Sequence, residues 1–380
     1  MLSWEYPPLV VGGIAAHVSG LTGALARAGH EVVVLTLHHP TVPDDTTVGG
    51  VRVLRARTDL PWIPDDDIVA RMASANHQIT QLAAQLGDWR PDVVHTHDWL
   101  TAWAGDTLKE LWGVPLVATI HATERGRHGG HVPGGQPAVI NAVEWWLTYQ
   151  AAEVICCSQF MRNEVIDGFE LPPSKVRLVP NGVDPALWAP PAGTPDTREP
   201  LVLAWGRVQY EKGFQVLASA IGRLRSRVPG LRCVIAGRGS YLPELQMQLD
   251  VEGVGDLVHL VGFISDDELR SLLHRAGCAV IPSLYEPFGI VALEAMAAGA
   301  PVVAARTGGL AEIVGGTEAG LLFEPGNVEQ LADRIAEVLT TPGAAGRVRH
   351  AAGDLLRDRY SWDAIAVSTL DAYQSALSVV

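Results

Sequence analysis

The sequence predicts an α/β protein made of two doubly wound domains of similar size, on three observations. Short β-branched runs alternate with helical patterns along most of the chain. A stretch with five prolines in sixteen residues, at 185–200, interrupts this alternation. The chain has 380 residues, which is more than one ordinary core requires. We therefore expect two parallel-sheet domains that face each other across a deep cleft.

Composition changes place the domain boundaries. We expect a first domain at 1–184, a proline-rich linker at 185–200, a second domain at 201–360 and a C-terminal helix at 361–380. No strand follows that last helix, so it must pack on a domain that is already formed.

Each expected strand is a short run rich in Val, Ile and Leu, which is typical of strands buried on both faces. In the first domain these runs are EVVVLTL (31–37), DVVH (92–95), PLVATI (115–120) and EVICC (153–157). In the second they are LVLAWG, CVIAG, LVHLVG, CAVIPS and PVVAA. The pattern at 13–29 predicts a helix that ends at Gly29. Only Met1 to Ser3 precede the WEYPP turn, so either the first strand is stunted or the numbering begins inside a longer reading frame.

Charge and cysteine usage exclude several classes of protein. The net charge of −14 argues against a nucleic-acid or membrane-surface partner. The four cysteines form neither a CxxC pair nor metal-ligand spacing, which favours a reducing compartment. The N-terminus lacks the pattern of a signal peptide, and no apolar run reaches the roughly 20 residues that span a membrane. We expect a cytoplasmic protein with no transmembrane segment.

Ligands of open parallel sheets bind beyond the carboxyl ends of the strands, so the residues there are the candidates. Gly12 and Gly13 precede the first helix and could offer amide groups to an anion, or serve only as a tight turn. His121 follows a strand and opens a loop with five glycines. His121, His128 and His131 could suggest a metal cluster, but they have no fixed ligand spacing, and we expect no metal site.

Arg207 and Lys212 lie in the loop WGRVQYEKGF after another predicted strand. The chain has only three lysines, and a cation pair at this position suits a diphosphate, with Arg as a planar fork and Lys as a point charge. The alternative is solvated surface charge.

Glu286 and Glu294 flank the start of a predicted helix that runs from Gly289 to about Ala298. Eight helical steps would separate them by about 12 Å. That exceeds the roughly 5–9.5 Å of a glycosidase carboxylate pair, so we expect them to accept hydrogen bonds from hydroxyl groups at two ends of one long ligand. Helix capping by Glu286 is the alternative.

These motifs resemble those of a known family. SWEYPPLVVGG, HTHDWLTAW, TIHATERGR, PNGVD, GRVQYEK and EPFGIVALE are similar to the retaining glycosyltransferases of family four, which have the GT-B fold of two Rossmann-like domains. The resemblance covers nearly the whole chain, and it implies that the C-terminal helix returns to the first domain. Within the family, the chain most resembles the glycogen-synthase-like α-glucosyltransferases of actinobacteria.

The resemblance implies a nucleotide-diphosphate sugar as donor, with ADP- or UDP-glucose favoured, and an oligo- or polysaccharide acceptor. It implies that Arg207 and Lys212 hold the diphosphate, with help from Gly13 and the amides of Gly289, Ile290 and Val291. Gly12 and Phe288 are also implied to bind the donor. The remaining roles are these: Glu294 at the ribose; Glu286 and His121 at the sugar; Phe263 and Ile264 at the base; and Asp98 and Trp99 on the acceptor side.

The implied reaction is hexose transfer with retention, such as α-1,4-glucan elongation, without a cofactor or an essential metal. Arg207 and Lys212 would stabilise the charge that grows on the leaving diphosphate. A nucleotide-sugar epimerase of the same fold, a family-four mannosyltransferase, a pyridoxal-phosphate phosphorylase and a non-catalytic sugar-nucleotide binder are the alternatives.

Overall fold

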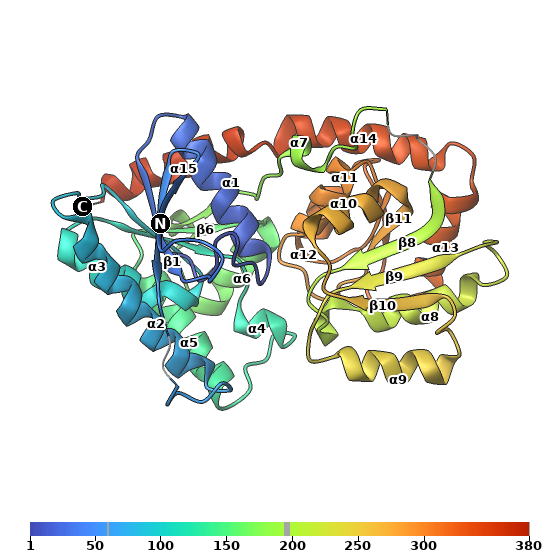
Figure 1. Cartoon of the computed structure of the whole chain (residues 1–380), viewed down its shortest axis with the longest axis horizontal. Helices are drawn as coiled ribbons and strands as arrows, with labels where there is room; N and C mark the ends of the chain where they lie inside the picture. The colour runs from blue at the N-terminus through green and yellow to red at the C-terminus, as the bar shows by residue number, and fades with distance from the viewer. Residues whose placement is uncertain (59–60, 194–197, 380) are drawn as a thin grey trace. The chain divides into compact units, whose positions relative to one another are not determined.

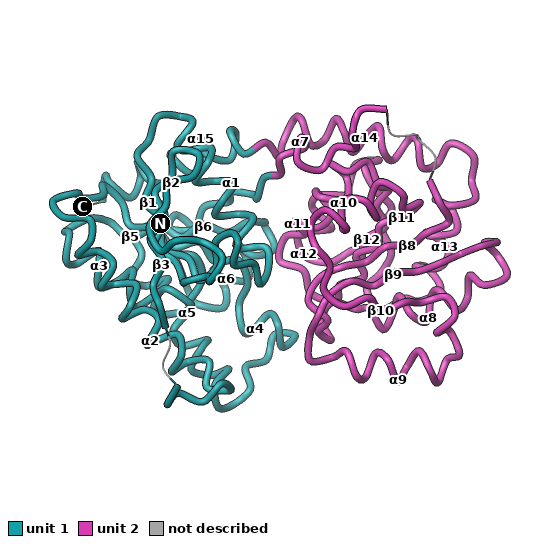
Figure 2. Tube along the Cα trace, viewed as in Figure 1, with its two compact units in different colours: residues 1–182, 362–380 teal, residues 183–361 magenta. Residues whose placement is uncertain are grey.

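The computed structural model describes residues 1–58, 61–193 and 198–379, and the chain forms two compact units (Figures 1 and 2). Unit 1 contains residues 1–182 and 362–380, and unit 2 contains residues 183–361. Each unit is an α/β domain of the Rossmann-like type. Its strands pair in parallel, except for one antiparallel edge strand in unit 1, Asp45–Val48, which the prediction of parallel sheets did not include. No helix among the described residues has the length and apolar character needed to cross a lipid bilayer.

Unit 1 contains seven strands and seven α-helices among its described residues. The strands are β1 (Val32–Leu37), β2 (Asp45–Val48), β3 (Val51–Ala56), β4 (Val94–His97), β5 (Leu116–Ile120), β6 (Glu153–Cys156) and β7 (Val176–Leu178). The helices are α1 (Gly13–Arg27), α2 (Ile68–Leu82), α3 (Ala102–Trp112), α4 (Glu124–Arg127), α5 (Gln136–Gln150), α6 (Gln159–Phe169) and α15 (Trp362–Leu377).

Leu2 joins the two parts of the sheet in unit 1. The strand orders are β1-β3-β2 and β4-β5-β6-β7, and Leu2 bridges to Leu35 of β1 and to Thr96 of β4. The Leu2 amide donates to the carbonyl of His95 at 2.8 Å, and the Ser3 amide donates to that of Leu35 at 3.1 Å. Leu2 therefore occupies a strand position as an isolated bridge between the two parts of the sheet.

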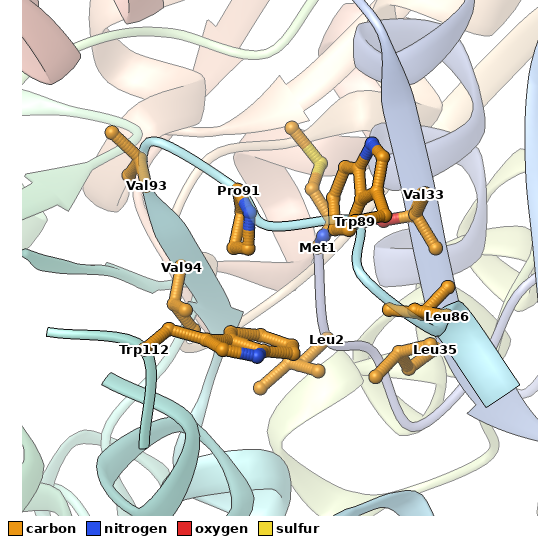
Figure 3. A pocket seen from close by; sticks show the side chains of 10 residues that line it. All are labelled: Met1, Leu2, Val33, Leu35, Leu86, Trp89, Pro91, Val93, Val94 and Trp112. Carbon is orange, nitrogen blue, oxygen red and sulfur yellow. Dashed lines mark hydrogen bonds between the residues drawn. The ribbon is translucent and has the colours of Figure 1, made fainter. Parts of the chain in front are cut away.

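An apolar pocket lies beside this junction (Figure 3). It is lined by Met1, Leu2, Val33, Leu35, Leu86, Trp89, Pro91, Val93, Val94 and Trp112. None of these side chains titrates, but the α-amino group of Met1 does. It donates to the carbonyl of Val33 at 2.6 Å, and burial lowers its pKa to about 5.

Helix α15 packs on α1, so the C-terminal helix belongs to unit 1. Two glycines make room for the indole of Trp362. A Cβ atom would lie 2.2 Å from that ring at Gly20 and 2.7 Å from it at Gly182. Larger residues there would displace the start of α15. Val380, the last residue of the predicted helix, lies outside the described residues.

Unit 2 is a single six-stranded parallel sheet in the order β10-β9-β8-β11-β12-β13. Its strands are β8 (Glu199–Trp205), β9 (Arg232–Ala236), β10 (Val258–Gly262), β11 (Ala276–Ile281), β12 (Val302–Ala305) and β13 (Leu321–Phe323). Its helices are α7 (Pro185–Trp188), α8 (Phe214–Leu224), α9 (Leu242–Glu252), α10 (Asp266–Arg275), α11 (Ile290–Ala297), α12 (Gly308–Val314), α13 (Val328–Thr340) and α14 (Ala344–Arg359).

The core of unit 2 forms where α8 and α13 cover the sheet. Leu217 and Ile221 of α8, and Leu331 and Ile335 of α13, are fully buried in it. The spacing of four residues within each pair places both members on one helix face.

The segment predicted as the linker 185–200 has structure at both ends. Pro185–Trp188 forms α7, whose N-cap Asp184 accepts a hydrogen bond from the amide of Ala186, and β8 already begins at Glu199. Residues 194–197 of the predicted linker lie outside the described residues. Proline at the first helical position explains how so proline-rich a segment forms a short helix.

Candidate active site

The loops after β8 and β11 meet at the carboxyl edge of the unit 2 sheet. The loop after β8 ends in a short 3₁₀ helix, Tyr210–Lys212, followed by Gly213 at φ +70°. A Cβ atom at Gly213 would lie 1.9 Å from the carbonyl oxygen of Pro282, so only glycine permits this approach. The amide of Leu284 donates to the carbonyl of Glu211 at 2.8 Å and closes the contact.

This contact brings together two of the predicted residues, Lys212 and Glu286. Lys212 Nζ lies 2.8 Å from Glu286 Oε2, and Ser283 Oγ donates to the same oxygen at 3.1 Å. The Glu286 backbone is also held, because its carbonyl accepts the Gly309 amide at 3.0 Å. The carboxylate is thus fixed in position and only 9% exposed.

Arg207 lies in the same loop as Lys212 but is more open to solvent. Its guanidinium is 3.8 Å from the carboxylate of Glu211. The motif GRxxxxK thus places two cations at one sheet edge, each beside a carboxylate.

Glu294 lies on α11, whose N-cap is Gly289 at φ +107°. Burial raises the pKa of Glu294 to about 8, and a hydrogen bond with the Trp205 side chain acts in the opposite direction. Ile290 and Val291 in the first turn are partly exposed. Phe288 is buried instead, with its ring 6.1 Å from that of Tyr360, so only its backbone can face a ligand.

Phe263 and Ile264 follow β10, two strands away from β8 in the sheet. The Phe263 ring is 62% exposed and Ile264 is half-buried. The guanidinium of Arg238, a residue that the sequence motifs did not single out, lies 5.7 Å from the centre of the Phe263 ring. The exposed ring offers a flat surface on which a base could stack.

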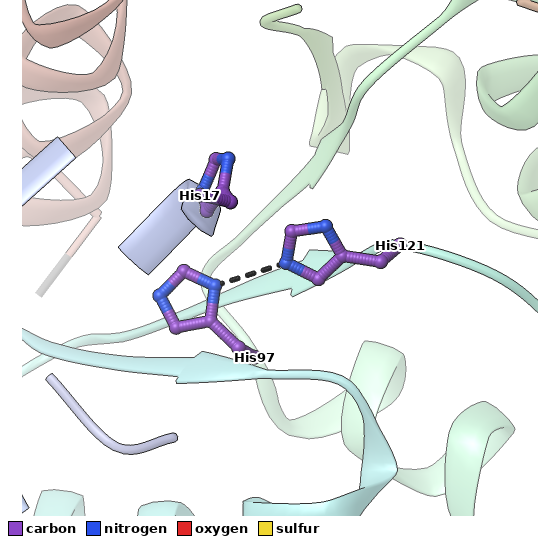
Figure 4. Close-up of side chains that lie close together, drawn as sticks. All are labelled: His17, His97 and His121. Carbon is purple, nitrogen blue, oxygen red and sulfur yellow. Dashed lines mark hydrogen bonds between the residues drawn. The ribbon is translucent and has the colours of Figure 1, made fainter. Parts of the chain in front are cut away.

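In unit 1, His121 follows β5 and lies among other histidines (Figure 4). Nδ1 of His97, at the end of β4, is 3.1 Å from Nε2 of His121. His17 of α1 packs edge-on against both rings, and its Nδ1 is 2.7 Å from Oδ1 of Asn181. Neither His17 nor His97 was predicted from the sequence, although His97 lies in the motif HTHDW and is the last residue of a strand.

Burial lowers the pKa of His17 and His97 well below the usual value, and that of His121 to about 3. All three rings are therefore neutral at pH 7. One ring nitrogen of each lies within 4.8 Å of the others, so these residues, rather than His128 and His131, are the ones whose spacing could admit a metal ion. His128 pairs with Glu124 at 3.1 Å.

Asp98 supports the histidine loop. It has a positive φ of 57°, and its carboxylate accepts the His121 amide at 2.6 Å. Burial raises the pKa of Asp98 to about 6. Trp99 is buried, with its ring 6.3 Å from that of Trp103, so it is not an exposed platform for an acceptor.

The amide of Gly12, predicted to face an anion, already has a partner. It donates to Oε2 of Glu5 at 2.8 Å, and Glu5 is buried. The N-terminus of α1 at Gly13 is therefore occupied by a carboxylate of this chain, which is the type of group that a helix N-terminus favours.

Two family models match the chain, one in each half. "Glycosyltransferase Family 4" matches residues 11–187, and "Glycosyl transferases group 1" matches residues 190–354. A relative named glycogen synthase, from Mycobacterium tuberculosis, is 40% identical over 99% of this chain and 94% of its own length. The chain belongs to glycosyltransferase family 4.

Other relatives of this glycosyltransferase agree over its full length. An uncharacterised glycosyltransferase from Methanocaldococcus jannaschii is 37% identical over 100% of this chain and 98% of its own. Sucrose-phosphate synthase from Thermosynechococcus elongatus has a similar structure, with a TM-score of 0.84 and 26% identity over 100% and 99% of the two chains.

The catalytic domain of starch synthase IV from Arabidopsis thaliana, bound to ADP and acarbose, has a TM-score of 0.79 over 99% and 98% of the chains. At 18% identity this likeness concerns the fold alone. The fold of the chain is GT-B.

Proposed function

We propose that this glycosyltransferase transfers glucose from UDP-glucose or ADP-glucose to an α-glucan, with retention of configuration and without an essential metal. The observation that carries the proposal is the bond between Lys212 and Glu286. It joins a cation suited to a diphosphate and a carboxylate suited to sugar hydroxyls at one sheet edge. The 40% identity to a glycogen synthase over 99% of the chain supports glucose and glucan as the substrates.

The proposed chemistry places growing negative charge on the leaving diphosphate beside Arg207 and Lys212. Cations that are already in place stabilise this charge without any rearrangement of the site during the reaction. Stabilising the leaving group in this way is the main task of the protein in this kind of transfer. The leaving phosphate then takes the proton of the acceptor hydroxyl that attacks from the same face of the sugar. We place the reaction in the cytoplasm, in keeping with the four free, buried cysteines.

The direct test incubates the protein with UDP-glucose or ADP-glucose labelled in the sugar, together with glycogen or maltoheptaose. Label should enter the polymer, and α-amylase should release it if the new bond is α-1,4. Transfer from GDP-mannose would instead identify a mannosyltransferase. Conversion of the nucleotide sugar without any acceptor would identify an epimerase.

The same assay should include small phosphorylated acceptors. Relatives at 32% identity are named alpha-maltose-1-phosphate synthase and D-inositol 3-phosphate glycosyltransferase. Faster transfer to glucose 1-phosphate or inositol 3-phosphate than to glucan would overturn the acceptor while leaving the donor assignment intact.

A further inference from the structure

Two neighbouring strands of unit 2 are each followed by the same dipeptide, Gly-Arg. β8 is followed by Gly206-Arg207 and β9 by Gly237-Arg238. Both glycines have positive φ, 139° and 149°, and a Cβ atom at Gly237 would lie 1.8 Å from the carbonyl oxygen of Gly206. The two turns therefore lie against each other, and the Val208 amide donates to the carbonyl of Arg238 at 2.8 Å. Strands β8 and β9 are neighbours in the sheet (Figure 1), so Arg207 and Arg238 follow adjacent strands at one sheet edge.

The cations at this edge differ in whether a carboxylate of the chain pairs with them. Lys212 is 2.8 Å from Glu286, and Arg207 is 3.8 Å from Glu211. Arg238 forms no ion pair with any residue in the described part of the chain, and its side chain is exposed. The two paired cations leave little net positive charge, whereas a nucleoside diphosphate carries at least two negative charges. Arg238 is the group that can supply the missing charge.

The order of the strands gives Arg238 a definite place along a bound nucleotide. In the sheet order β10-β9-β8-β11, the edge carries Phe263 after β10, Arg238 after β9, Arg207 after β8 and Glu286 after β11. An aromatic ring is thus followed by a cation, another cation and a carboxylate. A nucleotide sugar has a base, an α-phosphate, a β-phosphate and a sugar in the corresponding order.

We infer that Arg238 binds the α-phosphate of the donor nucleotide, with its guanidinium stacked on Phe263 while Arg207 and Lys212 bind the β-phosphate. This inference rests on the proposed function. The cation–π contact between Arg238 and Phe263, at 5.7 Å, holds the guanidinium between the phosphate and the base. Arg supplies a planar fork of N–H donors that matches phosphate oxygens.

Nucleoside mono- and diphosphates separate the two phosphate positions. Calorimetric Kd values should be measured for UDP and UMP, and for ADP and AMP, with the wild type, Arg238→Ala and Arg207→Ala. Arg238→Ala should weaken the diphosphate and the monophosphate alike, each by about tenfold or more, as expected for a lost charged hydrogen bond. Arg207→Ala should weaken the diphosphate far more than the monophosphate. An Arg238→Ala protein that binds UMP and AMP like the wild type would overturn the inference.

Arg232 provides a matched control on the same strand. It lies at the amino end of β9 and pairs with Glu199, so Arg232→Ala should change the Kd values by less than about twofold. Arg238→Gln and melting temperatures guard against misfolding of the alanine variant. If the wild type binds neither nucleotide pair, the proposed function fails as well. If it binds them and Arg238→Ala does too, only the role of Arg238 fails.

Discussion

Lys212 Nζ is 2.8 Å from Glu286 Oε2, although the two residues are 74 positions apart. Their side chains are only 20% and 11% exposed, so this pair is better shielded from water than a surface ion pair. Lys212 is expected to contact the phosphate of the donor and Glu286 its sugar hydroxyl groups, and the two residues are thereby held as one unit. A change at one residue must therefore affect the other.

Removing either cation of the GRxxxxK motif should mainly slow the reaction. We expect Lys212→Ala and Arg207→Ala each to lower kcat by about 10²–10³-fold, because each removes a preorganised charge beside the leaving group. Initial rates at saturating donor measure this. Arg225→Ala, which removes an exposed arginine paired with Asp256, is the control. Near-normal turnover in either test variant would rule out its role at the diphosphate.

Glucosyl transfer should continue in excess EDTA. We propose that the two cations at the sheet edge take the place of a divalent metal at the diphosphate, and no Asp-x-Asp motif follows a predicted strand. Product formation after EDTA treatment and desalting should match that of the untreated enzyme. Loss of activity that Mn²⁺ or Mg²⁺ restores would contradict this expectation.

The buried histidines of unit 1 should make the protein sensitive to acid. Burial lowers the pKa of His97 in the folded state, whereas in the unfolded state this histidine takes up a proton below about pH 6.5. The unfolded form binds more protons below that pH, so stability must fall as the pH falls. Asp98 and Glu144, whose pKa values burial raises to about 6 and 8, act in the opposite direction.

A variant comparison isolates the contribution of His97. Urea unfolding at pH 7, 6 and 5 should show the wild type losing up to about 1.4 kcal/mol per pH unit relative to His97→Gln. His350→Gln, at a site whose side chain is 86% exposed, should follow the wild type. If the free energy of unfolding changes with pH in the same way for His97→Gln and for the wild type, His97 is not kept neutral by the fold.

Most strands were predictable because Val, Ile and Leu runs mark them directly. Among the predicted strands, β4 is displaced by two residues, because it was expected at 92–95 and lies at Val94–His97. Its residues His95, Thr96 and His97 are polar yet fully buried, so they lack the apolar signature of a strand. Four strands were missed. β2 (DTTV) is a mostly exposed edge strand, arginines interrupt the apolar run of β3 (VRVLRA), and β7 and β13 have only three residues each.

The candidate site was predictable only where a motif is local. Arg207 and Lys212 are five positions apart, and their loop was evident because it directly follows the predicted strand LVLAW. The meeting of His17 with His97 and His121 depends on how α1 packs on the sheet, which no local pattern encodes. Arg238 has a local signal, since its Gly-Arg turn repeats that of Arg207 on the next strand. That repeat becomes meaningful only once the strands are known to be adjacent.

The two glutamates of the EPFGIVALE motif should differ in their kinetic effects. Glu286 is held beside Lys212 and is expected to face the sugar, which gains positive charge in the transition state. Glu286→Gln weakens charge-assisted hydrogen bonds there and disturbs Lys212, so kcat should fall with little change in KM. In Lys212→Ala the added Glu286→Gln change should cost less than it does alone, because the coupling is already lost.

Glu294→Gln should instead raise the donor KM, and by an amount that depends on pH. Burial raises the pKa of Glu294 to about 8, so in the free enzyme the carboxyl group is mostly protonated at pH 7 and resembles the glutamine amide. Above pH 8 it becomes a carboxylate, which accepts ribose hydroxyl groups more strongly than a neutral group does. The KM ratio of Glu294→Gln to wild type should therefore be small at pH 6.5 and grow to about tenfold by pH 9.

Ala297→Ser, one turn further along α11, is a mild control and should show no such trend. A ratio that is large at pH 6.5 and constant to pH 9 would show that Glu294 binds the donor already ionised, and a pH-dependent kcat would place it at the sugar instead of the ribose.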